Sequence, residues 1–457
     1  MNIKRNFSPS AVLLSSILLL SAALIVAACV GNKPGRNQIF LMPAPDVYDD
    51  GRIDPFIDND PISRGLQPGI LFATDRAPAE PGDKKYAHYT HRRGGALRLG
   101  LAQVKMGFDQ SISWEEARRI SLLKNRTDNY PLEVDEVNTF GVLDRTVSAM
   151  DDRSPISPEP GRRFAEAIDE RLATSRSKDV YVYVHGYKVR FENPILVASE
   201  LWHFLGYNGA FIAYSWPTKS SMWAYLTDLD SSINSARNLR TLIVHIAENT
   251  TAERIHLVGY SMGTRLVART LTDLGMYAYL IDQTEVREKL KLGNVLLIGS
   301  DVDRAILGGY LQDGSLRIVD SLTLYQSSDD GALNLSRRLF GRARAGQIVD
   351  DLTLGSRSGQ FFDKHPELRI IDVTDAEGGT SGSGHSYFRT SPWVSSDILM
   401  TLLYDLTPEE RGLVLRDDLP IWTFPDDYVV RLRESLGRVN PALAADVPED
   451  TPEDVPE

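Results

Sequence analysis

Short apolar runs alternate with longer amphipathic stretches through the middle of the chain. The apolar runs have the length, flanking turn residues and β-branched or aromatic content of strands. Predicted strands cover residues 70–74, 96–106, 179–185, 210–215, 255–259, 294–299, 321–325 and 368–373. Helical spacing of apolar residues follows in residues 164–173, 193–205, 231–248, 263–274 and 397–406. Such alternation predicts an α/β fold with a mainly parallel sheet that is covered by helices on both faces.

Three stretches lack this regular pattern. Residues 29–68 are rich in Pro, Asp, Asn and Gly, so we predict a tether with one short strand at 39–42. Residues 107–160 show only a short helix at 114–120 and receive no role. Residues 437–457 are rich in Pro and acids and cannot bury enough apolar surface to fold. The folded domain is therefore predicted to span residues 69–436.

The first residues have the pattern of an export signal. Lys4 and Arg5 precede an uncharged apolar run over residues 11–30, which small residues close just before Cys29. Cys29 is the only cysteine in the sequence, so the chain forms no disulfide of its own. We predict that residues 1–28 are a signal peptide.

A Gly-x-Ser-x-Gly turn joins the predicted strand 255–259 to the helix that follows it. In Gly259-Tyr-Ser261-Met-Gly263 the serine lies at a strained strand-to-helix turn that lifts its Oγ above the sheet. The two glycines keep Cβ atoms out of the close backbone contacts around that turn. Ser261 is therefore the predicted nucleophile.

A serine nucleophile needs a base at the same edge of the sheet, and strand polarity selects one histidine. In parallel sheets the active site lies at the carboxyl ends of the strands. The sequence holds eight histidines. Most fall inside predicted elements, in an early loop or before the last strand, whereas His385 follows the last strand in a Gly- and Ser-rich loop. His385 is the predicted general base.

The third member of a triad is a carboxylate that orients the imidazole. Two pairs of acids follow strand ends: Asp301 and Asp303 after 294–299, and Asp329 and Asp330 after 321–325. The chain order Ser, acid, His admits both pairs. Asp330 is preferred because the acid usually follows the next-to-last strand, with Asp329 and then Asp301 behind it.

The strand end at His185-Gly186-Tyr187 offers an oxyanion hole. We predict that the backbone N–H groups of Tyr187 and of Met262, which follows the nucleophile, bind the developing negative charge. His185 is predicted to orient this loop rather than to act as a second base.

Composition and charge exclude several other classes of function. The formal net charge is −12, and the last twelve residues supply half of it, so the clustered Lys and Arg that bind nucleic acid are not expected. The sequence has no His-x-x-x-His pair and no Cys cluster, so we expect neither a metal nor a cofactor.

These motifs together resemble an uncharacterised bacterial family of α/β-hydrolases that is described only as esterase- or lipase-like. The matching segments between residues 69 and 390 are FATDR at 72–76, LRLG at 97–100, VHGY at 184–187, SWP at 215–217, GYSMG at 259–263, DDGAL at 329–333 and GHSY at 384–387. The resemblance implies an α/β-hydrolase fold with the triad Ser261, Asp330 and His385. The segment ending at Cys29 resembles bacterial lipoprotein signals, which implies cleavage before Cys29 and its acylation.

The expected function is that of a serine hydrolase, a carboxylesterase or lipase acting on small-molecule or lipid esters at a membrane surface. An acyltransferase with the same triad is the nearest enzymatic alternative, and a non-catalytic binding or assembly protein of the cell envelope is the second class. Acyl chains on Cys29 would anchor the protein in the envelope. Val30 is not an acidic retention signal, which favours the outer membrane in a bacterium that has one.

Overall fold

One twisted sheet carries the fold of the computed structural model. The structure describes residues 38–49, 51–56, 69–106, 114–150, 156–219, 225–340, 342–347, 357–379, 384–417 and 419–439. The predicted signal peptide, Cys29 and the tail from residue 440 onward lie outside these ranges.

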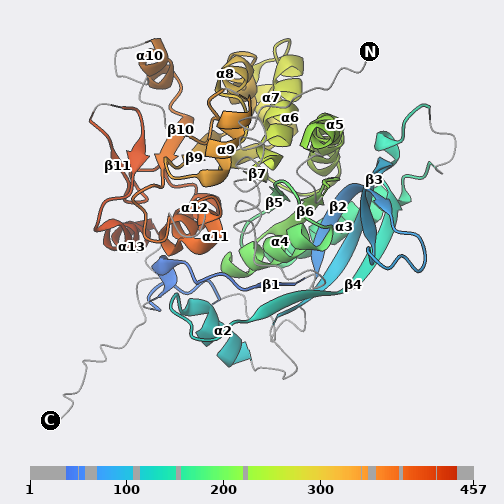
Figure 1. The fold of residues 1–457 in the computed structure, drawn as a ribbon, viewed down its shortest axis with the longest axis horizontal. Helices are drawn as coiled ribbons and strands as arrows, with labels where there is room; N and C mark the ends of the chain where they lie inside the picture. The colour runs from blue at the N-terminus through green and yellow to red at the C-terminus, as the bar shows by residue number, and fades with distance from the viewer. Residues whose placement is uncertain are drawn as a thin grey trace, which may run out of the picture.

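The elements follow the predicted order along the chain (Figure 1). The strands are β1 (Gln38–Phe40), β2 (Ile70–Pro78), β3 (Tyr89–Met106), β4 (Pro131–Val142), β5 (Asp179–Val184), β6 (Ala210–Ser215), β7 (Arg254–Tyr260), β8 (Leu292–Ile298), β9 (Ser321–Gln326), β10 (Leu368–Asp372), β11 (Val414–Leu415) and β12 (Trp422–Thr423). The helices are α2 (Trp114–Leu122), α3 (Glu159–Thr174), α4 (Glu192–Phe204), α5 (Tyr225–Asn249), α6 (Gly263–Ala278), α7 (Gln283–Leu290), α8 (Arg304–Gln312), α9 (Gly331–Phe340), α10 (Arg357–Lys364), α11 (Tyr387–Thr390), α12 (Pro392–Tyr404) and α13 (Tyr428–Val439), with short 3₁₀ turns η1 (Asp46–Tyr48), η2 (Asp144–Thr146) and η4 (Ser315–Ile318).

The described strands form a 12-stranded sheet in the order β1-β4-β3-β2-β6-β5-β7-β8-β9-β10-β12-β11. Pairing is parallel from β2 through to β12 and antiparallel at the two ends. The register sets Val184 opposite Gly259, and Gly259 opposite Leu297. The residues just after β5, β7 and β8 therefore meet at one edge of the sheet.

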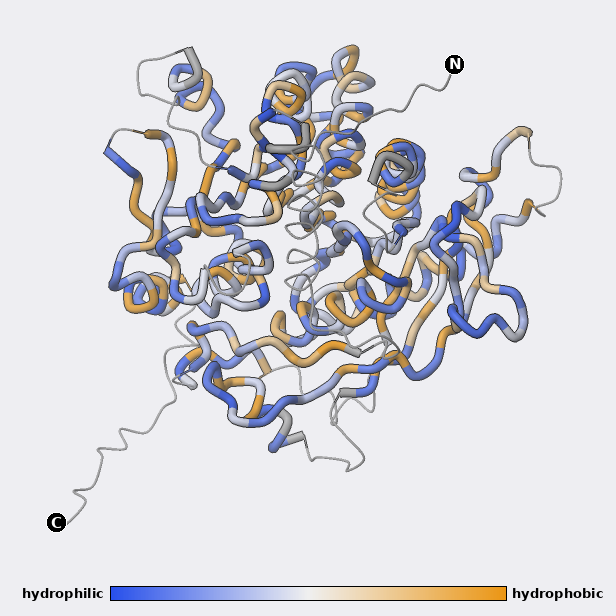
Figure 2. The backbone as a smooth tube through the Cα atoms, in the orientation of Figure 1, coloured by the Kyte–Doolittle hydropathy of each residue, from blue (hydrophilic) through white to orange (hydrophobic). Residues whose placement is uncertain are grey.

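Each central strand divides its side chains between two apolar cores. In β5, Val180, Val182 and Val184 pack into the core beneath α3, α5 and α6. Tyr181 and Tyr183 pack into the other core, with α4, α12 and α13. Figure 2 shows apolar and polar positions interleaved along the helices, as expected where one helical face covers a sheet. The predicted α/β fold with two covered faces is confirmed.

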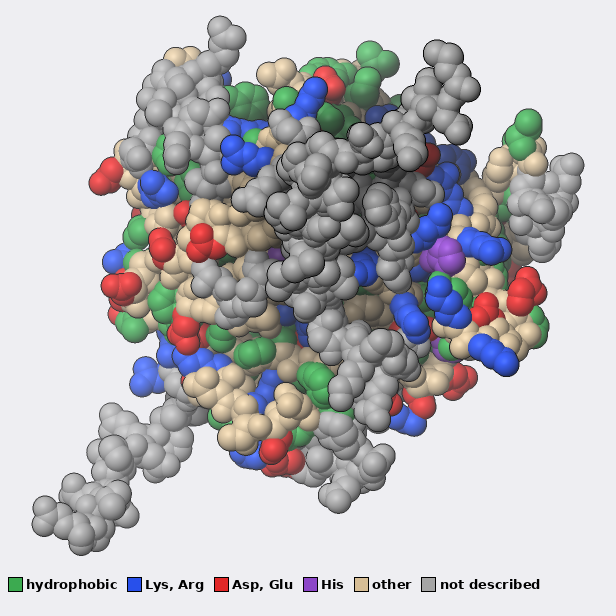
Figure 3. All heavy atoms as spheres, in the orientation of Figure 1, with side chains coloured by type: hydrophobic (Ala, Val, Ile, Leu, Met, Phe, Trp, Pro, Cys, Tyr) green, Lys and Arg blue, Asp and Glu red, His purple; other side chains and the backbone are tan. Residues whose placement is uncertain are grey.

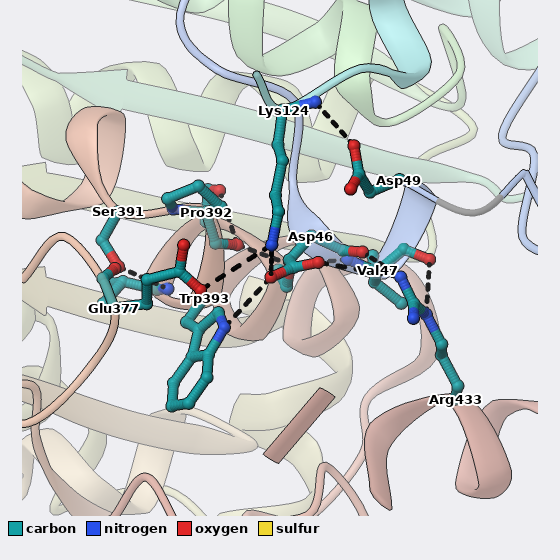
Figure 4. Close-up of polar contacts among 12 residues, drawn as sticks. Asp46, Val47, Asp49, Lys124, Glu377, Ser391, Pro392, Trp393 and Arg433 are labelled. Atoms are coloured by element: carbon teal, nitrogen blue, oxygen red, sulfur yellow. Dashed lines mark hydrogen bonds and ion pairs between the residues drawn. The ribbon is translucent and has the colours of Figure 1, made fainter. Parts of the chain in front are cut away.

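The predicted tether is wrong for residues 38–49 and 51–56, which are part of the folded body. β1 pairs with β4, and Val47, Tyr48 and Phe56 are almost fully buried. Asp46 accepts hydrogen bonds from the Lys124 Nζ at 2.7 Å and from the Trp393 indole at 3.0 Å (Figure 4). These contacts join the N-terminal segment to α12, near the other end of the chain.

The same cluster includes further contacts across the two ends of the chain. The Arg433 guanidinium of α13 donates to the Asp46 carbonyl (Figure 4). The Ser396 hydroxyl of α12 accepts from the Val47 N–H. At the C-terminal end of the domain, α13 extends to Val439, three residues past the predicted boundary. Within the described ranges no helix is long and apolar enough to cross a bilayer.

Candidate active site

The turn between β7 and α6 presents Ser261 in a left-handed backbone conformation, with φ of +51°. A β-carbon on Gly263 would lie 2.3 Å from the His185 carbonyl oxygen, and one on Gly259 would lie 3.0 Å from the Val267 side chain. Since real Cβ contacts are longer than 3 Å, Gly263 is required for the close approach of the two loops. The predicted strand–turn–helix geometry around the serine is confirmed.

Hydrogen bonds fix the strained turn on both sides. The Ser261 N–H donates to the Ile298 carbonyl at 2.9 Å, which ties the turn to β8. The Ser261 carbonyl accepts from the Thr264 N–H at 3.1 Å and from the Thr264 hydroxyl at 2.6 Å. The surrounding structure therefore determines a conformation that costs about 1–3 kcal/mol for a non-glycine residue.

Ser261, His385 and Asp330 form one chain of hydrogen bonds. The Ser261 Oγ lies 2.9 Å from the His385 Nε2, and the His385 Nδ1 lies 2.6 Å from the Asp330 Oδ2. A carboxylate accepts, so Nδ1 carries the proton, and Nε2 is left to accept from the serine hydroxyl. The structure thus brings together the three residues that the sequence proposed.

Asp330 is held in place from both sides. It is fully buried, and its second carboxylate oxygen, Oδ1, accepts from the Leu333 N–H at 2.9 Å, at the start of α9. One oxygen thus caps a helix while the other faces the imidazole.

The His385 imidazole packs in a closed environment. Its ring lies 5.1 Å from the Tyr260 ring and against Gly299, where a β-carbon would be 3.1 Å from the His385 Cε1. Burial by itself would lower the pKa of His385, but the charge and hydrogen bond of Asp330 outweigh it, and the pKa is raised above its ordinary value of 6.5.

The alternative acids have other partners. Asp301 forms an ion pair with Arg265 at 3.1 Å and accepts from the Ser336 hydroxyl at 2.7 Å. Asp303 caps the start of α8, and Asp329 is exposed with its carboxylate beside the Ser328 hydroxyl. Asp330 is therefore the acid of the two predicted pairs that contacts His385.

The loop after β5 lies against the nucleophile. A β-carbon on Gly186 would be 2.9 Å from the Ser261 Cβ, so the Gly186–Tyr187 peptide is a direct neighbour of the serine. Met262 occupies the N-cap position of α6. Both backbone groups proposed for the oxyanion hole thus belong to segments that adjoin Ser261.

Sequence reasoning missed the buried groups beneath this loop. Arg76 and Trp216 were recognised only as parts of short motifs, yet both contact His185: the Arg76 guanidinium at 3.3 Å and the Trp216 ring stacked at 5.4 Å. Tyr387, whose hydroxyl accepts from the Gly299 N–H at 2.6 Å, was missed too. The one available signal was an arginine two residues past the predicted strand 70–74, a position that the structure places within β2. Among the described residues no group of His, Cys, Asp and Glu could hold a metal ion.

Residues 162–403, more than half of the chain, match the family model of an alpha/beta hydrolase of unknown function (DUF900). The chain is a member of this family of α/β-hydrolases. It is also 32% identical over 82 residues to an uncharacterised protein of Nostoc sp.. That match spans 18% of this chain and only 21% of the relative.

Solved structures of similar fold include a lipase-esterase related protein of Clostridium acetobutylicum, with 9% identity, 50% of this chain and 95% of that chain covered, and a TM-score of 0.27. Esterase B of Lactobacillus rhamnosis has 10% identity, 52% and 80% coverage and a TM-score of 0.30. Esterase 2 of Thermogutta terrifontis has 13% identity, 50% and 81% coverage and a TM-score of 0.27.

Proposed function

We propose that this protein is a serine hydrolase that cleaves carboxylic esters through an acyl-enzyme on Ser261. The observation that supports this most strongly is the chain of hydrogen bonds from the Ser261 Oγ through His385 to the buried Asp330 carboxylate. A serine, a base within hydrogen-bond reach and a group that orients the base are the requirements for nucleophilic catalysis.

Each group has a defined task in the proposed reaction. The His385 Nε2 takes the hydroxyl proton as the Ser261 Oγ attacks the acyl carbon, and Asp330 stabilises the resulting imidazolium. The N–H groups of Tyr187 and Met262 bind the oxyanion of the tetrahedral intermediate. His385 then protonates the departing alcohol, and water, activated by the same base, releases the acid from Ser261.

A series of 4-nitrophenyl esters of increasing acyl length tests this proposal. We expect hydrolysis by the full chain and a loss of several orders of magnitude in kcat for Ser261→Ala. Ser300→Ala is a matched control, because Ser300 is also a buried serine after a strand but bonds to Thr264. Equal rates for wild type and Ser261→Ala would refute the proposal, and activity confined to short acyl groups would define an esterase rather than a lipase.

We also propose that the protein is held at the bacterial envelope by acyl chains on Cys29. The support is the charged, apolar and small-residue pattern of residues 1–29. Cells fed a radioactive fatty acid should label the wild-type protein and fractionate it with membranes. Cys29→Ala should remain unlabelled, and labelling of that variant would contradict the proposed anchor.

A further inference from the structure

Arg76 lies buried within β2, where β3, β6 and the loop after β5 meet, with 1% of its surface exposed. Its Nε donates to the hydroxyl of Ser215, the last residue of β6, at 3.0 Å, and its Nη1 donates to the Thr90 carbonyl at 3.4 Å. Its Nη2 donates to the Val189 carbonyl at 3.1 Å and to the His185 Nε2 at 3.3 Å. One guanidinium therefore connects the oxyanion loop to β3 and β6.

The partners of His185 fix its tautomer. The Nδ1 lies 2.7 Å from the Gly186 carbonyl oxygen, which can only accept, so Nδ1 carries the hydrogen. Nε2 faces the Arg76 Nη2, which can only donate, so Nε2 offers its lone pair. The Trp216 carbonyl, 3.1 Å from Nε2, favours the opposite tautomer, in which Nε2 carries the hydrogen. In that form, however, the Nδ1 lone pair would face the Gly186 carbonyl oxygen, and the Nε2 hydrogen would face the N–H of Arg76.

The charge states of the pair agree with this assignment. Burial, reinforced by the charge of Arg76, lowers the pKa of His185 well below its ordinary value, so the ring is neutral. Burial lowers the pKa of Arg76 to about 10, which leaves the guanidinium charged at neutral pH. A neutral imidazole beside a permanent cation has its Nε2 lone pair directed at that cation.

The tautomer determines which way the next peptide faces. In a trans peptide the C=O of one residue and the N–H of the next point in opposite directions, and the described residues contain no cis bond. Because the Gly186 carbonyl is bonded to the His185 ring, the Tyr187 N–H points to the other side of this peptide. A glycine peptide flips easily, and a flipped one would turn a carbonyl oxygen toward the developing oxyanion.

We propose that Arg76 is a positioning residue for the oxyanion hole. It holds His185 in the Nδ1–H tautomer, the ring holds the Gly186 carbonyl, and the Tyr187 N–H is thereby kept toward the acyl oxygen beside Ser261. This inference rests on the proposed hydrolase function, and it adds a residue that touches neither the substrate nor the triad.

Two substitutions of His185 separate the contacts of the ring. In His185→Asn the amide nitrogen takes the place of Nδ1 and can still donate to the Gly186 carbonyl. In His185→Gln the amide reaches the place of Nε2, near Arg76, and the donor to Gly186 is lost. We measure the rate at which a fluorophosphonate labels Ser261 in the full chain, and the final stoichiometry of labelling.

We expect His185→Asn to be labelled within a few-fold of the wild-type rate and His185→Gln about 10²–10³-fold more slowly, the usual loss of one oxyanion donor. Both should still reach one label per chain, because a positioning defect slows the reaction while a folding defect lowers the end point. Equal losses in the two variants would overturn the proposal.

Arg76→Lys tests the arginine itself while it keeps a positive charge beside the buried Asp75. A single ammonium cannot serve His185 and Val189 as a guanidinium fork does, so the labelling rate should fall at least about 10-fold at unchanged stoichiometry. Arg93→Lys is the control. Arg93 lies opposite Arg76 in the register of β2 and β3, but it is exposed. A wild-type labelling rate in Arg76→Lys would overturn the proposal.

Nitrogen NMR of His185 gives a readout that does not depend on catalysis. The wild type should show the Nδ1–H tautomer throughout the neutral pH range, and Arg76→Lys should show a mixture of tautomers. If wild-type Ser261 is not labelled at all, the proposed function fails. In that case the tautomer measurement still decides the role of Arg76, and an Nε2–H ring in the wild type would overturn it.

Discussion

Asp330 and Asp301 are two buried carboxylates within the same part of the sheet edge, yet only the first contacts His385. The difference is set by what each oxygen meets: an imidazole and a helix start for Asp330, and Arg265 with a serine hydroxyl for Asp301. At the residue scale, function therefore depends on partners more than on burial or chain order.

Substitution of each acid by asparagine should give opposite phenotypes. Asp330→Asn is expected to lower kcat roughly 10⁴-fold with little loss of stability, because the imidazole loses its orientation and its counter-charge. Asp301→Asn should keep kcat and lower the free energy of unfolding, since it removes the negative charge that pairs with Arg265 at 3.1 Å and with Arg344 at 3.5 Å. Ester hydrolysis and thermal unfolding of both variants measure this, and the reverse pattern would show that the acid is misassigned.

The pH dependence follows from the environment of His385. The base must be neutral to accept the serine proton, so kcat/KM should rise with pH, with a midpoint above the ordinary value of 6.5 because the pKa is raised. Asp330→Asn removes the two larger effects that raise this pKa, while burial, which lowers it, and the smaller effect of the Asp301 charge, which raises it, remain. The midpoint of the residual activity should therefore move to lower pH. Rates from about pH 5 to 9 test this, and a wild-type midpoint below the ordinary value would contradict it.

The residues reached from sequence were those whose position follows from strand polarity. Ser261 and His385 follow strand ends, whereas chain order admits both pairs of acids, and Asp330 is preferred only by the rule that the acid usually follows the next-to-last strand. The role of Arg76 could not be found, because its partner His185 lies 109 residues away and a single arginine has no local pattern.

At the scale of elements, the sequence predicted the strands whose two faces are both buried, and it missed a strand whose pairing is irregular. The eight predicted strands are present, but β4 was missed. A β-bulge in its pairing with β3, where Gln103 and Val104 face Glu136 and Val134, breaks the two-residue alternation that sequence analysis relies on. The short helices α7 to α10 were missed because eight to ten residues give only about two turns of periodicity.

The contact between the start of α6 and the oxyanion loop predicts the effect of Gly263→Ala. The added methyl would meet the Val184 and His185 carbonyl oxygens at 2.4 and 2.3 Å, so the loop must move away from Ser261. We expect a loss of about 1–3 kcal/mol in the free energy of unfolding and a fall in kcat larger than any change in KM. Gly308→Ala, on α8 with open space around it, is the control and should be neutral; an unchanged kcat for Gly263→Ala would refute the proposed contact.

At the scale of the whole molecule, the two ends of the described chain meet around Asp46. Sequence analysis predicted a tether there because the segment has no local period, and its burial depends on α12 and α13, more than 300 residues away in sequence. Only long-range packing could reveal that residues 38–49 and 51–56 belong to the domain.

Asp46→Asn should therefore destabilise the whole domain. The change leaves the Lys124 ammonium, whose side chain is 18% exposed, without the carboxylate that lies 2.7 Å away. Because Lys124 is partly exposed and keeps a second ion pair with Glu377 at 3.7 Å, we expect a loss of about 1–3 kcal/mol in the free energy of unfolding, which thermal or denaturant unfolding would detect. Asp83→Asn, in an exposed turn, should change stability by less than about 0.5 kcal/mol. Equal stabilities of the two variants would contradict a structural role for the N-terminal segment.

A group of cations lies at the carboxyl edge of the sheet on the side of β2 and β3. Burial, together with the charges of Lys85, Lys219 and Arg92, lowers the pKa of His91. Figure 3 shows Lys and Arg side chains grouped with a His on this side of an otherwise acidic protein. Lys219 follows β6, two strands away from β7, the strand that precedes Ser261.

This local field predicts a preference for anionic esters. Added salt should lower kcat/KM for a 4-nitrophenyl ester with a terminal carboxylate more than for its neutral analogue, because screening weakens the attraction. Lys219→Glu should reverse the preference. Lys289 lies on α7, which precedes β8 and is therefore at the opposite edge of the sheet, so Lys289→Glu should leave the preference unchanged. Equal effects of the two substitutions would show that the local cations do not act on the substrate.

The central claim is that Ser261 is an activated nucleophile. Mass spectrometry of the full chain after brief exposure to a fluorophosphonate tests it most directly. We predict one adduct per chain, located on the peptide that contains Ser261 and absent from Ser261→Ala and from the urea-unfolded protein. An unmodified wild-type chain, or an adduct located on another residue, would contradict the account.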